Sequence, residues 1–174
     1  MNSVDAIKEL REQTSCGVID CKKALEEARG DLKKAKEILQ KRGLEIAAKK
    51  AGREAKEGRV EGYVHNGSKI AVLVEVNCET DFVARSEDFI RFTKDLAMHI
   101  AAMAPEYIKD TEVPGDVLSQ HPNRELYFKE KVLLSQPFVK DQGKTIQEYL
   151  NELIAKIGEN ILISRFIRYQ VGQK

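Results

Sequence analysis

The sequence is poor in the residues that build disulfide scaffolds, rigid turns and large aromatic cores. It has three cysteines, four prolines and no tryptophan in 174 residues. An odd number of cysteines without scaffold spacing argues against a disulfide-stabilised fold and favours a reducing compartment, so we expect a cytoplasmic protein. No apolar run approaches the ~18 residues that a membrane span requires, and the charged segment 4–9 does not resemble a signal peptide. We therefore expect no membrane association.

An excess of charge of either sign is also missing. Lys and Arg number 29 and Asp and Glu number 28, which gives a formal net charge of +1. This balance offers no electrostatic basis for nucleic-acid binding, so no direct nucleic-acid partner is expected. Residues 1–59 hold 15 basic and 11 acidic side chains and residues 60–174 hold 14 and 17, so the charge is only mildly uneven. With 42% apolar and 33% charged residues, the composition predicts one medium globular domain or two small ones.

Signals for cofactors, metals and covalent catalysis are weak. No glycine-rich phosphate loop is present, and the histidines His65, His99 and His121 are scattered, so we expect no cofactor and no metal site. Cys78 with His65 or His99 would supply a nucleophile and a base, but a cysteine that ends an apolar strand is usually a small buried hydrophobe. The other two cysteines, five positions apart, match neither a redox motif nor a zinc spacing. We therefore assign no catalytic residue.

The first 57 residues predict a small helical bundle. Apolar residues recur there at steps of three or four, and caps or glycines separate the periodic runs. We expect three short helices and a connecting helix: one opened by Ser3 with the stripe Val4, Ile7 and Leu10, one over 18–28 ended by Gly30, one opened by Asp31 and closed by Gly43, and the connecting helix over 44–56. A bundle of about 45 residues is near the lower limit for independent folding and should be only marginally stable.

The pattern changes at Gly58. Strand-like runs over 59–65 and 68–77 meet at Asn66-Gly67, which predicts a hairpin because both turn positions tolerate positive φ. Both faces of the second run carry apolar residues, so both are expected to be partly buried. The later elements are expected to be a helix opened by Ser86 with the stripe Phe89, Phe92, Leu96, Ile100 and Met103, a loop over 104–122, a helix within 123–135 with Leu126 and Leu133 facing inward, a helix opened by the capping box Thr145–Glu148, and a strand over 161–171.

These elements together predict an α+β fold with an antiparallel sheet. Hairpin strands are antiparallel, which excludes a βαβ architecture for the second part of the chain. We expect two domains: residues 1–57, a three-helix head with its linker helix, and residues 58–174, an α+β core.

The connection between the second strand and the next helix holds the most informative residues. The segment Asn77–Arg85 places an acidic residue, a large aromatic and a branched aliphatic together at Asp81, Phe82 and Val83. Connections lie on the surface, where a Phe-Val pair has no core of its own. Two interpretations stay open from the pattern: Phe82 is a solvated wedge for a partner protein, or it turns into the core as a helix-entry staple.

Four segments of the sequence carry a resemblance to a known family. They are LRExT at 10–14 with DCKKAL at 20–25, AAKKA at 47–51, EVNCETDFVA at 75–84, and QPFV at 136–139. With the last helix and strand they span most of the chain, and the segment at 75–84 is the most specific. The whole resembles elongation factor Ts, the guanine-nucleotide exchange factor of bacterial-type translation.

The resemblance implies how the core acts. The family's core presents a loop, here Thr80–Val83, near the magnesium and the nucleotide phosphates of elongation factor Tu. By this resemblance Phe82 enters an apolar cleft between partner helices and Asp81 disturbs the magnesium surroundings. Thr80 and Val83 complete the loop. The implied activity is GDP release without covalent chemistry.

The resemblance also implies a head of the ubiquitin-associated type that docks on the GTPase domain, with contacts at Arg11, Val18 and Ile19. The family commonly has Gly-Ala-Gly and two methionines where this chain has the segment 15–19, SCGVI. Branched residues are stiffer than methionine, so the head contact is expected to be more selective or weaker. Long members carry a duplicated core, whereas short members tend to self-associate, so a homodimer is implied.

Two rival functions are kept beside this one. The first is a helical-head binding module, an adaptor for RNA or for a ubiquitin-like protein, without exchange activity. Its lysine-rich run over 33–56 is interrupted by Glu37, Glu45 and Glu54, which favours a solvated helix face over an RNA site. The second is an enzyme that uses Cys78. The intact segment 80–83 argues against the adaptor module, and insensitivity of the activity to thiol alkylation would exclude the enzyme.

Overall fold

The helices and strands follow one another along nearly the whole chain. A computed structural model describes residues 3–14 and 16–173. The elements are α1 (Ser3–Thr14), α2 (Val18–Glu27), α3 (Leu32–Lys50), β1 (Glu57–Val64), β2 (Ile70–Cys78), α4 (Asp81–Ala84), α5 (Glu87–Met103), η1 (Asp110–Glu112), α6 (Gly115–Gln120), α7 (Arg124–Lys131), η2 (Leu133–Ser135), β3 (Pro137–Phe138), β4 (Asp141–Thr145), α8 (Ile146–Ile157) and β5 (Leu162–Gln170). The predicted cap at Ser3 concerns a side chain outside the described residues. Within the described ranges, no helix is long and apolar enough to cross a bilayer.

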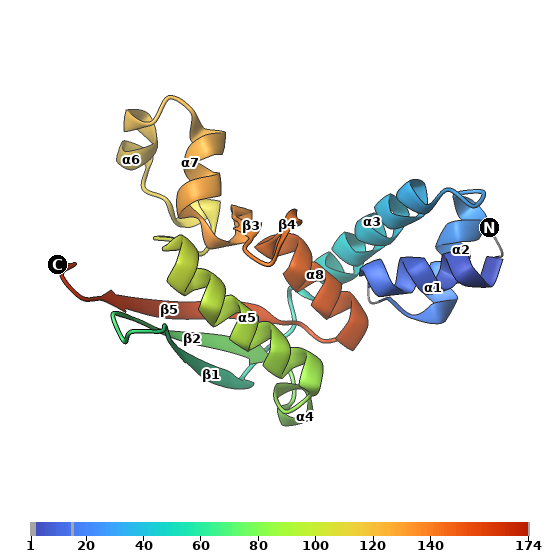
Figure 1. Ribbon diagram of the computed structural model, residues 1–174, viewed down its shortest axis with the longest axis horizontal. Coiled ribbons are helices and arrows are strands. Elements are labelled where there is room, and N and C mark those ends of the chain that lie inside the picture. The colour runs from blue at the N-terminus through green and yellow to red at the C-terminus, as the bar shows by residue number, and fades with distance from the viewer. Residues whose placement is uncertain (1–2, 15, 174) are drawn as a thin grey trace. The chain divides into compact units, whose positions relative to one another are not determined.

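The fold is α+β, as predicted, and it divides into two compact units (Figure 1). The first unit comprises Met1–Arg53 with Leu150–Asn160. The second comprises Glu54–Tyr149 with Ile161–Lys174. Helix α8 therefore begins in the second unit and continues into the first.

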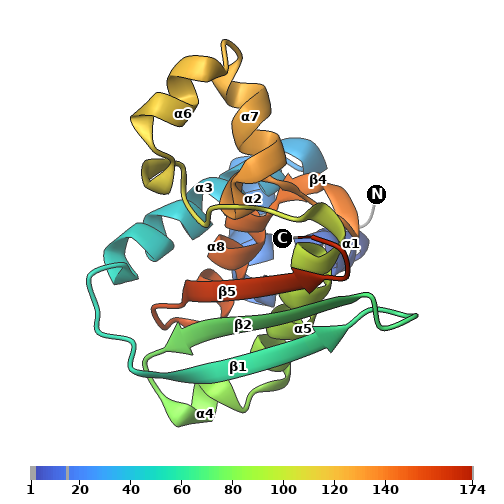
Figure 2. The same ribbon diagram turned by 90° about the vertical axis from the view of Figure 1, so that its left-hand side faces the viewer.

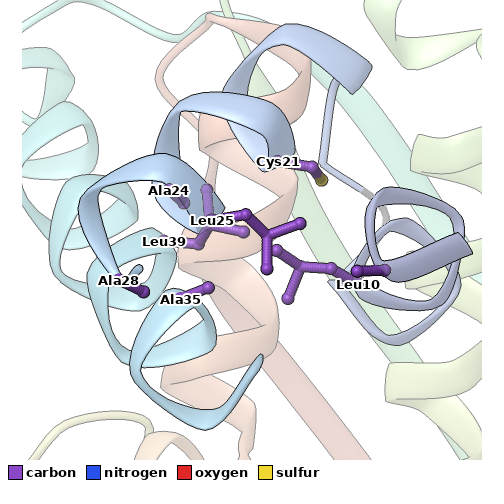
Figure 3. Close-up of a cluster of buried hydrophobic side chains, with 8 residues drawn as sticks. Leu10, Cys21, Ala24, Leu25, Ala28, Ala35 and Leu39 are labelled. Atoms are coloured by element: carbon purple, nitrogen blue, oxygen red, sulfur yellow. The ribbon is translucent and has the colours of Figure 1, made fainter. Parts of the chain in front are cut away.

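The core of the first unit is built from leucines and small residues. Leu10, Leu25 and Leu39 point toward one another among alanines and Cys21 (Figure 3). Small side chains let α1, α2 and α3 approach closely, but they bury little apolar area. Val4, predicted for the inner face of α1, is exposed. The buried face runs through Ala6 and Leu10, and Val4, two positions before Ala6, lies on the other side of the helix.

The start of α3 agrees with the sequence prediction, but its end does not. The Asp31 side chain accepts hydrogen bonds from the backbone N–H groups of Lys33 and Lys34 at 3.0 and 3.1 Å, as a helix cap does. The predicted stop at Gly43 is wrong, because α3 continues to Lys50 as one helix of 19 residues. A Cβ at Gly43 would lie 3.9 Å from the Ala155 Cβ, so this glycine lies where helices α3 and α8 of the first unit pack closely.

The second unit is organised around an antiparallel sheet in the order β1-β2-β5, with α5 across one face (Figure 2). The predicted β1–β2 hairpin is confirmed. Its turn differs from the expected one: positive φ occurs at Gly67 and Ser68 and not at Asn66. The His65 N–H donates to the Ile70 carbonyl at 2.9 Å, which closes a longer loop than the predicted two-residue turn.

Only one face of the sheet is covered within this unit. The buried side chains of β2 meet those of α5; they are Val72, Val74, Val76, Phe89, Phe92, Leu96 and Ile100. Met103, predicted for the same stripe, is partly exposed at the end of α5. The prediction that both faces are partly buried is wrong at Leu73, which is exposed because its face carries no helix of the described part of this unit (Figure 2).

The segment after α5 is more ordered than predicted. The expected loop over 104–122 contains η1 and α6. In α7 the inward residue is Tyr127, which packs with Val113 and Val132, whereas the predicted Leu126 is exposed. The short hairpin of β3 and β4 was not predicted, because Pro137 and a five-residue polar strand carry almost no strand pattern.

A buried polar clamp joins α5 to the segment before β4. The Nδ1 atom of His99 accepts the Val139 N–H at 3.2 Å, so Nε2 carries the proton and donates to the Gln136 Oε1 at 2.9 Å. Gln136 in turn donates to the carbonyl of Glu130 at 2.7 Å. Burial lowers the pKa of His99, against a smaller opposite effect of the Gln136 hydrogen bond. The clamp therefore requires neutral His99.

The last helix and strand agree with the sequence prediction. Glu148 N–H donates to the Thr145 hydroxyl at 3.2 Å, and the Thr145 N–H donates to the Glu148 carboxylate at 2.7 Å. This is the predicted capping box at the start of α8. Strand β5 then pairs with β2 along most of its length, with one bulge at Glu75 and Val76.

Candidate partner-binding site

The segment predicted as an exposed loop is the one-turn helix α4 with its cap. Thr80 is the N-cap, and its hydroxyl accepts the Val83 N–H at 3.4 Å. Helix α4 lies where β2 ends and β1 begins, and it packs on both strands (Figures 1 and 2). Only Ala84 of the four helical residues is fully buried, so one side of the turn is fixed and the other faces solvent.

Phe82 is the most exposed large hydrophobic residue described, with 81% of its surface accessible. The alternative that Phe82 is a buried staple is therefore wrong. Helix geometry explains this, because a residue two positions before Ala84 points to nearly the opposite side of a one-turn helix. An aromatic ring held in water by a short helix is a ready anchor for an apolar cleft on another protein.

Asp81 lies beside Phe82 and is paired within the same helical turn. Its carboxylate is 3.0 Å from the guanidinium of Arg85, four residues later. Both side chains are substantially exposed, and a pair of this kind contributes at most about 1 kcal/mol. The carboxylate is thus oriented by Arg85 but is readily released to a cation on a partner.

The backbone beneath α4 is held by a set of contacts at the end of the sheet. Asn77 donates to the Glu57 carbonyl at 3.2 Å and accepts a hydrogen bond from Ser164. Gly58 has a φ of 153°, and a Cβ there would lie 2.3 Å from the Val76 carbonyl oxygen, so only glycine fits. The strands that precede α4 are therefore locked in register.

Two of the three predicted head residues share one cavity in the first unit. Arg11 of α1 and Val18 of α2 line a cavity of about 600 Å³. The charged side chains on its wall are Lys8, Arg11, Glu12, Asp20, Arg42 and Lys156. Ile19 does not line this cavity and is 69% exposed beside Val18. The lining thus combines apolar side chains with four cationic and two acidic groups, which suits an acidic partner surface.

The cysteines do not form a reactive site. Cys16 and Cys21 flank the start of α2 at the N′ and N4 positions, the places of a hydrophobic staple, and burial raises the pKa of both thiols. Cys78 is fully buried, and its Sγ donates to the Thr80 carbonyl at 3.1 Å. His99 is engaged in the clamp with Gln136. Among residues 3–14 and 16–173, no group of three or more metal-binding side chains is present.

Several residues of these sites were missed by sequence reasoning. Arg85 follows the Thr80–Val83 segment at helical spacing from Asp81, a signal that becomes visible once the segment is recognised as a helix. Ser86 was identified as a cap of α5, but its hydroxyl also donates to the Val83 carbonyl at 2.8 Å. Lys8 lies one turn before Arg11 on α1, so helical periodicity predicts that both reach the same surface.

Comparison with known proteins identifies relatives along nearly the whole chain. The family model described as "Elongation factor TS" matches residues 13–126 and 123–173. A protein named Elongation factor Ts from Acetivibrio thermocellus is 50% identical over 196 residues, covering 99% of this chain and 91% of the relative. One of the same name from Caldanaerobacter subterraneus is 47% identical over 196 residues, covering 99% and 98%. One from Desulforamulus reducens is 48% identical over 194 residues, covering 98% and 89%.

Proposed function

The chain belongs to the elongation factor Ts family, and we propose that it performs guanine-nucleotide exchange through the exposed turn α4. It binds elongation factor Tu in its GDP form and promotes GDP release so that GTP can bind. No covalent bond is made or broken in this activity, and the cytoplasm is its proposed location. The observation that carries the proposal is Phe82, an anchor that is 81% exposed on a turn otherwise fixed to the sheet.

Phe82 supplies the wedge in this proposal. Acceleration of GDP release by about 10⁴-fold needs roughly 5.5 kcal/mol of differential stabilisation. Burial of the ring in an apolar cleft of the GTPase contributes about 1.5–3 kcal/mol. The wedge therefore begins release but does not account for all of it. The rest must come from the magnesium and phosphate contacts that the partner loses.

Asp81 acts on the magnesium surroundings. Its exposed carboxylate stands next to Phe82, so insertion of the ring brings a negative charge toward the nucleotide site. A carboxylate competes for a hard cation with the phosphate and carboxylate oxygens that normally hold it. Thr80 and Val83 hold the turn that presents both side chains.

The head supplies binding rather than release. Arg11, Val18 and Ile19 are proposed to dock on the GTPase domain, with residues 1–57 acting as a tether and residues 58–174 as the exchange module. Binding that is equal in all nucleotide states raises affinity without raising the rate of the release step. Linkage also requires that nucleotide weakens the binding of this factor as much as the factor weakens nucleotide binding.

The uncovered face of the sheet supports a homodimer as the second partnership. Five exposed apolar side chains from three strands share this face: Val60, Val64, Leu73, Ile167 and Tyr169. In the row of Val60, at one end of this group, the Arg165 guanidinium hydrogen-bonds Glu75 at 2.6 Å and lowers the pKa of that carboxylate, which keeps the pair charged. A second copy offers the same apolar face and the complementary charges in an isologous packing of two sheets.

A substitution on this face tests the dimer. Leu73→Glu places a charge on the central strand of the proposed interface, so sedimentation equilibrium should report a monomer where the wild-type chain reports a dimer. Leu126→Glu, at an exposed leucine of α7, is the matched control and should leave the mass unchanged. A wild-type monomer at high micromolar concentration would remove the dimer from the proposal.

The exchange activity is tested by release of a fluorescent GDP analogue from elongation factor Tu. Addition of this chain should accelerate release in the presence of excess unlabelled nucleotide. The same chain should not change the equilibrium ratio of bound GTP to GDP, because an exchange catalyst cannot shift it. A release rate equal to the spontaneous rate at saturating chain would contradict the proposed function and leave a binding module without exchange activity.

A further inference from the structure

The thiol of Cys78 joins the end of β2 to helix α4. Cys78 is fully buried, and its Sγ donates to the Thr80 carbonyl at 3.1 Å, which is short for a thiol donor. The same carbonyl accepts the Ala84 N–H at 3.2 Å, the main-chain bond that closes the first turn of α4. One carbonyl oxygen therefore connects the rigid sheet with the turn that presents Phe82.

Helix α4 depends on such contacts because it is too short to persist alone. A single helical turn fixes several dihedral angles for very few hydrogen bonds, so its formation in isolation is unfavourable. Side-chain contacts at both ends offset this cost: the Thr80 hydroxyl accepts the Val83 N–H, and the Ser86 hydroxyl donates to the Val83 carbonyl. Thr80 and Ser86 are both partly exposed, whereas Cys78 lies wholly inside the unit.

We infer that Cys78 is a positioning residue for nucleotide exchange. Its thiol fixes the Thr80 carbonyl and thereby holds α4 in the orientation that exposes Phe82 and directs Asp81 outward. This inference rests on the proposed function, in which α4 acts on the GTPase. A turn that is already ordered loses little conformational freedom when it inserts, so the thiol contributes to the release step more than to overall affinity.

Three variants separate this role from simple core packing. Cys78→Ala removes the donor, and Cys78→Ser replaces it with another donor of similar size. Val76→Ala is the matched control, because Val76 lies two residues earlier on the same buried face and truncation there removes apolar volume without touching the Thr80 carbonyl. Each variant is titrated against elongation factor Tu loaded with fluorescent GDP, and urea unfolding establishes that it is folded.

Loss of the hydrogen-bond donor at position 78 should change the rate of GDP release at saturating chain and leave the half-saturating concentration of the chain unchanged. Cys78→Ala should lower the saturating release rate about fivefold, as expected for loss of one net hydrogen bond, with half-saturation unchanged within about twofold. Cys78→Ser should recover the rate to within about twofold of wild type, since a hydroxyl donates to the same carbonyl. Val76→Ala should keep the wild-type saturating rate even though it lowers stability.

Amide hydrogen exchange supplies a readout that does not depend on the partner. The Ala84 amide should exchange faster in Cys78→Ala and at the wild-type rate in Cys78→Ser and Val76→Ala. A wild-type saturating rate in Cys78→Ala, or an equal loss in Val76→Ala, would overturn the inference while the proposed function stands. If the wild-type chain itself fails to accelerate GDP release, the proposed function falls and the exchange role of Cys78 falls with it.

Discussion

Helix α4 and the head present exposed apolar side chains on very different supports. Phe82 stands on one helical turn, fixed from below by buried Ala84 and by the packing of α4 on β1 and β2. Val18 and Ile19 stand on a bundle whose core is mostly leucine and alanine. A single large side chain on a stiff support suits a local distortion of a partner. Several smaller side chains on a bundle with a core of leucine and alanine suit adaptable docking.

The core of the second unit contains larger buried side chains than the core of the head. Phe89 and Phe92 are fully buried under the sheet of the second unit and bury far more area than any residue of the head cluster. In the head cluster Leu10 is the largest side chain with no exposed surface. The difference predicts that the head opens at a lower free energy than the sheet unit, and that its contact with a partner tolerates more change.

The largest expected effect concerns the stability of the head. Leu10→Ala removes its central side chain and should destabilise the bundle by about 2–5 kcal/mol. Hydrogen exchange should show lost protection in α1, α2 and α3, while the amides of α5 keep theirs. Phe92→Ala is the reciprocal variant and should affect α5. Equal loss of protection in both units after Leu10→Ala would show that they unfold as one.

The next effect concerns the wedge. Phe82→Ala should lower the saturating rate of GDP release by about 10- to 150-fold, which corresponds to loss of about 1.5–3 kcal/mol of ring burial. Because Phe82 is exposed in the free chain, the variant should unfold at the same temperature as the wild-type chain. Leu126→Ala truncates another exposed apolar residue, outside both sites, and should release GDP like wild type.

A smaller effect is expected at the head surface. Val18→Asp combined with Ile19→Asp should raise the half-saturating concentration about 5- to 30-fold, as expected for about 1–2 kcal/mol of apolar contact. The saturating release rate should stay at the wild-type value. Val4→Asp changes an exposed apolar residue of the same bundle outside the cavity and serves as control. A lower saturating release rate in the double variant would show that the head contributes to the release step.

The smallest effect is a pH dependence confined to the sheet unit. The pKa of His99 is lowered by burial in the folded chain, so the unfolded chain binds more protons as pH falls through the ordinary histidine value of 6.5. Stability from the clamp is therefore fully present above that value and decreases below it. The urea concentration at the midpoint of unfolding of the sheet unit should therefore fall as the pH is lowered from 7.5 to 5.5. His99→Gln should make the midpoint less dependent on pH in this range.

Several helix starts could be predicted from local sequence signals, and the structure has them at the predicted residues. Asp31, Ser86 and the Thr145–Glu148 box cap helices where the sequence predicts them, because each cap depends only on neighbouring backbone groups. Gly43 shows the limit of such signals. A glycine can end a helix, but within a helix it also allows another helix to pack closely. The residue that packs against Gly43 is Ala155, more than a hundred positions away in the sequence, so no local pattern reveals this role.

The candidate site was predictable in composition but not in conformation. The sequence places Asp81 and Phe82 together, yet their pattern leaves open whether the ring is buried. A one-turn helix has too few residues for periodicity to detect, so α4 and the pair of Asp81 with Arg85 were missed. The uncovered sheet face was missed for another reason: Leu73 has the same apolar character as buried strand residues, and only the position of α5 decides which face is covered.

The coupling between factor and nucleotide tests most directly whether α4 drives nucleotide release. Calorimetric titration gives the affinity of this chain for nucleotide-free elongation factor Tu and for its GDP form, and the ratio of the two cancels binding that is common to both states. Phe82→Ala should reduce this ratio, whereas the Val18→Asp and Ile19→Asp variant should lower both affinities and leave the ratio unchanged. An unchanged ratio in Phe82→Ala would contradict the claim that α4 drives nucleotide release.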